Sequence, residues 1–232
     1  MTRNLQTIGF DADDTLWHNE RFFQLTQERF AALLKDHAEA DHLGARLLEA
    51  ETRNIGHYGF GVKGFVLSMI ETAIEVTDGR VPGSVISELL KAGQDMLNHP
   101  IELLPHAREA VEALAEKHHL VLITKGDLLH QERKLAQSGL GELFDAVEIV
   151  SDKQADTYAR IFGRSPGGPE AAMMVGNSLK SDVRPALEAG SWGVHVPQDL
   201  LWSLEHAETP DHPRFVELRD LGALPELVSR IG

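Results

Sequence analysis

Three carboxylates follow an apolar segment near the start of the chain, in the sequence FDADDT at residues 10–15. Side chains of a β-strand alternate between its two faces, so Asp11 and Asp13 can point the same way from the end of a strand. Two carboxylates this close repel each other unless a cation, a shared proton or basic side chains offset the repulsion. The pair therefore indicates a metal-assisted or acid–base site, and a solvent-exposed turn rich in Asp is the alternative.

The elements that would position these acids are strands alternating with helices. Apolar runs predict buried strands over residues 5–10, 120–124, 146–150, 171–175 and 192–196. Helical spacing predicts helices over residues 106–117, 128–137, 154–162, 183–189 and 221–231. Residues 197–213 are predicted to be mostly loop, with one or two helical turns over 200–205. This alternation predicts an α/β fold with a parallel, doubly wound sheet and right-handed crossovers.

A long segment between the first two predicted strands shows only helical spacing. Residues 19–98 predict about four helices, and we place a helical domain at residues 17–99 inside a core domain formed by residues 1–16 and 100–232. Residues 54–64 of the insert combine glycines with aromatic and basic side chains, which is typical of a connection between helices. The alternative is a segment that contacts the substrate through Arg53, His57, Tyr58 or Lys63.

Polar side chains also follow the other predicted strands. Ligands of such sheets bind beyond the carboxyl ends of the strands, at the point where the strand order reverses. The residues at these ends are Asp11 and Asp13 after the first strand, Thr124, Lys125 and Gly126 after the second, Lys153 after the third, and Asn177 and Asp182 after the fourth. Four such ends together favour a single site for phosphoryl transfer.

Each of these groups has a part in that chemistry, because phosphoryl transfer depends on positioning and on neutralising charge. We expect Asp11 to be the nucleophile, forming an aspartyl-phosphate, and Asp13 to be first the general acid and then the general base. Phosphoryl oxygens would be bound by Thr124, Lys125, Gly126 and Lys153. Oxygen ligands for Mg²⁺ would come from Asp11, Asp13, Asn177 and Asp182.

The combination of FDADDT, LITKGD, Lys153 and GNSLKSD resembles the haloacid dehalogenase-like hydrolase superfamily. The resemblance covers residues 5–14 and about 105–196, and it implies a Rossmann-like core, a mobile helical cap and a Mg²⁺-dependent phosphatase. The family usually has Asp where this chain has Asn177, which should weaken metal binding. Gln154 stands where the family often has Pro after the lysine, so the helix that follows should begin differently.

Other activities fit some of the same residues. A 2-haloacid dehalogenase of the same superfamily also uses an attacking Asp, but it needs no metal and by resemblance usually lacks an acid at the place of Asp13. A receiver-like signalling domain pairs acids with Thr and Lys, but it has no place for a helical insert. A phosphomutase is a variant of the phosphatase, and the sequence does not reveal the groups that it would need.

Composition limits the partners of the chain. Lys and Arg number 22 against 36 Asp and Glu among 232 residues, and the formal net charge of −14 argues against nucleic acid as a partner. The sequence has no cysteine, which excludes disulfides and thiolate sites. No apolar run reaches the roughly 18 residues that span a bilayer. We therefore expect a cytoplasmic protein, bound to no membrane, that acts on a small phosphorylated substrate. The sequence leaves open whether the protein forms a homodimer.

Overall fold

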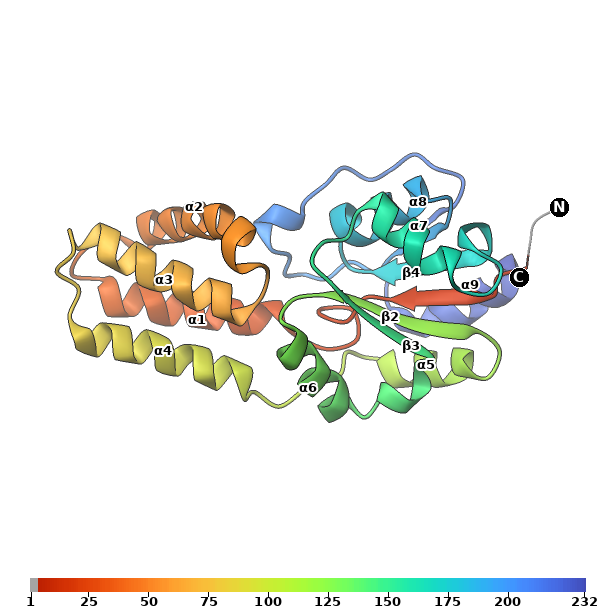
Figure 1. Ribbon diagram of the computed structural model, residues 1–232, viewed down its shortest axis with the longest axis horizontal. Coiled ribbons are helices and arrows are strands. Elements are labelled where there is room, and N and C mark those ends of the chain that lie inside the picture. The colour runs from red at the N-terminus through yellow and green to blue at the C-terminus, as the bar shows by residue number, and fades with distance from the viewer. Residues whose placement is uncertain (1–3) are drawn as a thin grey trace. The chain divides into compact units, whose positions relative to one another are not determined.

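The computed structural model describes residues 4–232, so residues 1–3 of the predicted core domain lie outside the described part. The chain forms two compact units, both visible in Figure 1. The first comprises the residues up to Glu20 together with Ile101–Lys125 and Gln131–Gly232. The second comprises Arg21–Pro100 and Gly126–His130.

The first unit is built on one sheet of six parallel strands. They are β1 (Thr7–Phe10), β2 (His119–Lys125), β3 (Ala146–Val150), β4 (Ala172–Gly176), β5 (Trp192–His195) and β6 (Phe215–Glu217). Their order is β3-β2-β1-β4-β5-β6, so the order reverses between β1 and β4. The predicted α/β fold with a Rossmann-like, doubly wound sheet is confirmed, and the end of β1 lies at its switch point.

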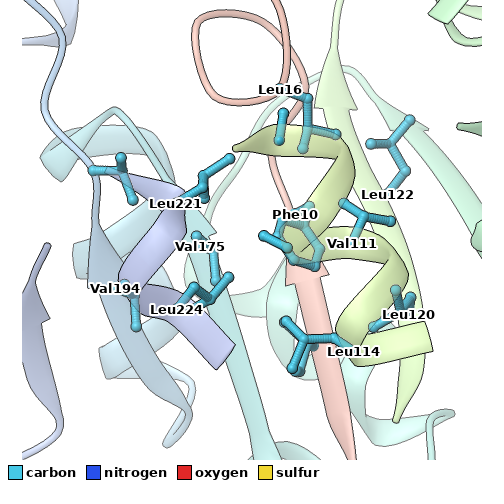
Figure 2. Packing of buried hydrophobic residues seen from close by; sticks show 14 of the residues in the cluster. Phe10, Leu16, Val111, Leu114, Leu120, Leu122, Val175, Val194, Leu221 and Leu224 are labelled. Atoms are coloured by element: carbon cyan, nitrogen blue, oxygen red, sulfur yellow. The ribbon is translucent and has the colours of Figure 1, made fainter. Parts of the chain in front are cut away.

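Helices cover both faces of this sheet. They are α5 (Ala107–Ala115), α6 (Leu128–Ser138, whose first turn belongs to the second unit), α7 (Ala155–Gly163), α8 (Arg184–Glu188) and α9 (Leu224–Ile231). Alternation along the strands sends Phe10 and Val175 into one apolar cluster with α5 and α9, as Figure 2 shows. On the other face Met174 packs with residues of α7. The two apolar layers hold β1 rigidly between them.

Gly9 shows how tightly the second layer packs. A Cβ atom at this position would lie 3.0 Å from both Ile123 Cδ1 and Phe162 Cζ. These contacts are tighter than ordinary van der Waals contact, so a side chain here would require α7 and β2 side chains to shift by a few tenths of an ångström. The strand that leads directly into Asp11 is therefore packed tightly against its neighbours.

The second unit is helical, as predicted. Its helices are α1 (Glu20–Leu34), α2 (Ala40–Tyr58), α3 (Val62–Val76) and α4 (Gly83–Leu97), and they enclose an apolar cluster that includes Phe30, Phe65 and Met69. The segment 54–64 proves to be largely helical, because α2 runs to Tyr58 and α3 begins at Val62. Arg53 pairs with Glu71 and Glu75, and Lys63 pairs with Asp127 of the same unit.

The structure adds elements that the sequence pattern does not predict. Strand β6 pairs with the edge of β5 over only three residues, too few for a recognisable alternation. A π-helical turn, η3 (Leu179–Val183), which leads into α8, is a second such element. The loop before β6 contains one short 3₁₀ turn, η4 (Ser203–Glu205), within the residues 200–205 where one or two helical turns are predicted. Within residues 4–232, every helix is too short or too polar to cross a membrane.

Candidate active site

The structure brings three predicted site residues into direct contact at the switch point. Lys153 Nζ lies 2.5 Å from Asp11 Oδ1 and 2.7 Å from Asp182 Oδ1. All three side chains are at least nine-tenths buried. Thr15 Oγ1 donates to the other oxygen of Asp11 at 2.9 Å. Loops after β1, β3 and β4 therefore meet around the proposed nucleophile.

Negative charge exceeds positive charge in this cluster, because one lysine contacts two carboxylates. Burial raises the pKa of Asp11 to about 7, with Asp182 adding to the rise and Lys153 opposing it. Burial alone would lower the pKa of Lys153, but Asp11 and Asp182 together raise it. Lys153 therefore stays positively charged, and Asp11 shares this charge with Asp182. Additional positive charge would stabilise both carboxylates.

Asp13 is held by donors on three sides. Lys134 Nζ contacts both of its oxygens, at 2.6 and 2.7 Å, and Trp17 Nε1 and Gln131 Nε2 donate at 2.7 and 2.9 Å. Burial would raise the pKa of Asp13, but the Lys134 charge and these hydrogen bonds outweigh it and lower that pKa. In the free protein Asp13 is therefore an ionised carboxylate.

Sequence reasoning missed both Gln131 and Lys134. They lie three residues apart on α6, so they share a helical face, and both side chains are buried. The signal available in the sequence is their i, i+3, i+4 spacing with the apolar Leu135, which is the spacing of one helix face. That signal does not say which acid they contact.

The groups predicted to bind phosphoryl oxygens lie in different places. Thr124 is buried, and its hydroxyl accepts a hydrogen bond of 3.2 Å from Gln131, which also contacts Asp13. Lys125 instead pairs with Glu205, so its charge is already compensated. Gly126 has a φ of 127°, a conformation that glycine adopts without strain, and it belongs to the second unit.

Asn177 lies beside the nucleophile through its backbone. Its N–H donates to Thr15 Oγ1 at 3.1 Å, and that hydroxyl in turn donates to Asp11. Its carbonyl accepts from His195 Nε2 at 3.0 Å. Among the residues that the structure describes, none forms a hydrogen bond with the Asn177 side chain, so the amide oxygen is available to a ligand.

The oxygen atoms predicted to bind a metal suit Mg²⁺, which needs only a few ligands from the protein. Across residues 4–232 no three His, Asp or Glu side chains are grouped so as to enclose a metal ion. The oxygens of Asp182 accept from Lys153 and from Ser178 N–H, and those of Asp13 face Lys134. The two oxygens of Asp11 likewise accept from Lys153 and Thr15, so of these four residues the Asn177 side chain alone has no hydrogen-bond partner among residues 4–232. Mg²⁺ commonly keeps several waters beside one or two carboxylates, so Asp11 together with Asn177 would be a sufficient ligand set. The metal-binding roles of Asp11, Asp13, Asn177 and Asp182 all stay predictions.

Glu205 is a further residue that the sequence did not indicate. It comes from η4, and its carboxylate accepts from Lys125 Nζ at 2.7 Å, from Ser178 Oγ at 2.6 Å and from Ser181 Oγ. Burial would raise its pKa, but the Lys125 charge and these hydrogen bonds prevail and lower it to about 2. An acid in an irregular segment has no periodicity that would mark it.

The low pKa of Glu205 predicts a specific acid dependence of stability. Because this pKa falls from 4.5 to about 2 on folding, the carboxylate stabilises the fold above pH 4.5, and this is lost as the pH falls toward 2. Glu205→Gln should lower the free energy of unfolding by about 3 kcal/mol at pH 7 and by less than about half as much at pH 3. Urea unfolding at both pH values measures this, with the exposed Glu208→Gln as control. A deficit that is as large at pH 3 as at pH 7 would contradict it.

Comparison with solved structures finds relatives of this chain. A haloacid dehalogenase-like family hydrolase from Xanthomonas campestris is 41% identical, with 98% of this chain and 91% of that chain covered and a TM-score of 0.89. No curated protein matches significantly.

More distant structures share the fold. The HAD-hydrolase YfnB from Bacillus subtilis, bound to magnesium, is 18% identical over 97% of this chain and 99% of that chain, with a TM-score of 0.66. L-2-haloacid dehalogenase from Xanthobacter autotrophicus, with chloropropionic acid covalently bound, is 20% identical over 98% of this chain and 100% of that chain, with a TM-score of 0.68. The family model for haloacid dehalogenase-like hydrolases matches residues 5–190. The chain therefore belongs to the haloacid dehalogenase-like hydrolases.

Proposed function

We propose that the protein is a Mg²⁺-dependent phosphatase that hydrolyses a small phosphorylated metabolite through Asp11. One observation carries the choice: a second carboxylate, Asp13, stands two residues after the nucleophile and is held in place by Lys134. Release of an alcohol from a phosphate ester needs a proton donor, whereas release of a halide does not. A carboxylate fixed beside the nucleophile therefore serves a phosphatase and is superfluous in a dehalogenase.

In the proposed reaction an oxygen of Asp11 attacks phosphorus, and the bond from phosphorus to the leaving oxygen breaks as Asp13 protonates that oxygen. Asp13 then removes a proton from water, which attacks the aspartyl-phosphate and releases phosphate and free Asp11. The ionised state of Asp13 in the free protein suits the second step. An anionic substrate raises the pKa of a neighbouring carboxyl group, and this favours the protonation that the first step needs.

The charges of the site suit an anionic substrate once a metal is bound. The cluster contains four carboxylates and three lysines, which leaves one net negative charge: Asp11, Asp13, Asp182 and Glu205 against Lys125, Lys134 and Lys153. A divalent cation held by Asp11 and Asn177 would change this to one net positive charge. When bound, Mg²⁺ supplies positive charge for the phosphoryl oxygens.

A dehalogenase is the second candidate. Asn177 replaces the acid expected for a metal ligand, and a structure of similar fold carries a covalently bound chloropropionic acid. That likeness is at 20% identity, so it supports the fold rather than the activity. As a member of a hydrolase family the chain is an enzyme, which sets a receiver-like signalling role aside.

The deciding experiment is a screen of phosphorylated metabolites and 2-haloacids, each with Mg²⁺ or with EDTA. We expect release of inorganic phosphate that falls about 100-fold or more in EDTA and returns with Mg²⁺, because the charge of the metal stabilises the transferring phosphoryl group. Asn177→Asp should lower the Mg²⁺ concentration needed for half-maximal rate, because a carboxylate binds Mg²⁺ more tightly than an amide.

Halide release that persists in EDTA, without phosphate release, would overturn the phosphatase and favour the dehalogenase. A transferred phosphoryl group, in place of free phosphate, would identify a phosphomutase instead. The proposal includes a cytoplasmic location, which the absence of cysteine supports. It includes no nucleic acid or membrane partner, in keeping with the formal net charge of −14.

A further inference from the structure

The network around Glu205 joins three segments that are far apart in the sequence. Lys125 ends β2, Ser178 and Ser181 belong to the turn after β4, and Glu205 lies in the irregular segment after β5. Lys125 Nζ donates both to Glu205 and to Ser181 Oγ, the latter at 2.8 Å. The same segment is held a second time, because Lys180 Nζ donates to the carbonyl of Leu204 at 2.6 Å.

Donors and acceptors in this network match without conflict. Each serine hydroxyl gives its one proton to Glu205 Oε2 and accepts one hydrogen bond, Ser178 from the Ser181 backbone N–H and Ser181 from Lys125. Lys125 and Glu205 have side chains only 14% exposed. A largely buried polar network with matched donors and acceptors fixes the geometry of the segments that it joins.

The turn that Glu205 holds also carries part of the active site. Ser178 N–H donates to Asp182 Oδ2 at 3.0 Å, and the other oxygen of Asp182 contacts Lys153. Lys153 in turn contacts Asp11. A continuous chain of hydrogen bonds and turn geometry thus runs from Glu205 to the lysine beside the nucleophile.

We propose that Glu205 is a positioning residue of the active site, whose carboxylate fastens the Ser178–Asp182 turn to Lys125 and so orients Asp182 and Lys153 toward Asp11. It touches no reacting atom itself. Its kinetic effect rests on the proposed phosphatase function, whereas its structural effect does not. Glu205 also neutralises Lys125, which therefore acts as an anchor of the turn instead of a phosphoryl-binding group.

The test is chemical rescue of Glu205→Ala. The substitution leaves one ammonium group and two hydroxyls around the space that a carboxylate filled, and formate can occupy that space. We expect kcat to fall about 10-fold or more with a smaller change in KM, because Lys153 is misplaced while the substrate contacts remain. Added sodium formate, compared with sodium chloride at equal ionic strength, should restore several-fold of kcat and raise the unfolding temperature of this variant.

Matched variants separate this effect from simple loss of structure. Glu208→Ala removes an exposed glutamate three residues further along and should leave kcat unchanged, with or without formate. The double variant Lys125→Met, Glu205→Ala lacks the cation, so formate should neither restore its rate nor raise its unfolding temperature. If Glu205→Ala does not fold, Glu205→Gln keeps the side-chain length without the charge, and its kcat should fall about fivefold.

Wild-type kcat in Glu205→Ala, or in Glu205→Gln where that variant is needed, would overturn the inference. So would a loss of kcat in Glu205→Ala that formate does not relieve. Absence of phosphatase activity in the wild-type protein would instead overturn the proposed function. In that case the unfolding temperature of Glu205→Ala in formate still tests this inference, because it needs no substrate.

Discussion

Asp11→Asn should reduce phosphate release by about 10⁴-fold or more, because an amide cannot attack phosphorus and loss of a nucleophile is among the costliest changes in an enzyme. The fold should survive, since Asn has nearly the same shape and its amide oxygen can still accept from Lys153, although its NH2 group cannot accept from Thr15. The measurement is kcat for the substrate found in the screen. Asp36→Asn, an exposed aspartate of the second unit, is the matched control and should retain the wild-type rate.

The same variant should not be less stable at pH 8 in metal-free buffer. The pKa of Asp11 rises from 3.8 to about 7 on folding, so the folded protein binds more protons than the unfolded chain between these values. Stability therefore falls as the pH rises through this range, and a neutral Asn avoids the loss. Urea unfolding in EDTA measures this. Retention of more than a hundredth of the wild-type rate would contradict the assignment of Asp11 as the nucleophile.

Lys153→Met is expected to have the largest effect on stability. It would leave Asp11 and Asp182 facing each other in a buried site without their shared cation. Removing one partner of a buried ion pair costs about 3–5 kcal/mol, so the free energy of unfolding should fall by that amount. Turnover should be lost as well, because no ammonium group then neutralises the attacking carboxylate. Urea unfolding at pH 7.5 gives the first quantity and phosphate release the second.

Two further variants make this prediction specific. Lys117→Met removes an exposed lysine and should change the free energy of unfolding by less than about 0.5 kcal/mol. The double variant Asp11→Asn, Lys153→Met removes one of the two facing charges and should be more stable than Lys153→Met alone. A loss of less than 1 kcal/mol in Lys153→Met would show that the two carboxylates do not depend on this lysine.

The fold was predictable where the sequence carries a strong period. Wholly apolar strands and amphipathic helices can be recognised from their hydrophobic patterns. The rule that ligands bind at strand ends then predicts that Asp11, Lys153 and Asp182 lie together. The same rule places Asn177 in the loop after β4, where its backbone reaches Thr15. Alternation was too short to reveal β6, whose three residues pair with the edge of the sheet.

The rest of the site depends on tertiary contacts that no local pattern contains. Lys134 reaches Asp13 across 121 residues of sequence, and Glu205 reaches Lys125 across 80. Neither residue stands at the end of a strand. Lys125 shows the converse, since it stands at the end of β2 and yet pairs with Glu205. Position after a strand indicates which residues are near the site, and only the packed structure assigns their partners.

The division of the chain into units has a consequence for how such a protein can diversify. All the charged residues of the cluster, from Asp11 to Glu205, belong to the first unit, whereas Arg21–Pro100 forms one uninterrupted stretch of the second. A single recombination event could replace Arg21–Pro100 as one piece while leaving all the proposed catalytic residues in place. Proteins that descend from one ancestral gene could thus acquire new substrate preferences while keeping the same catalytic residues.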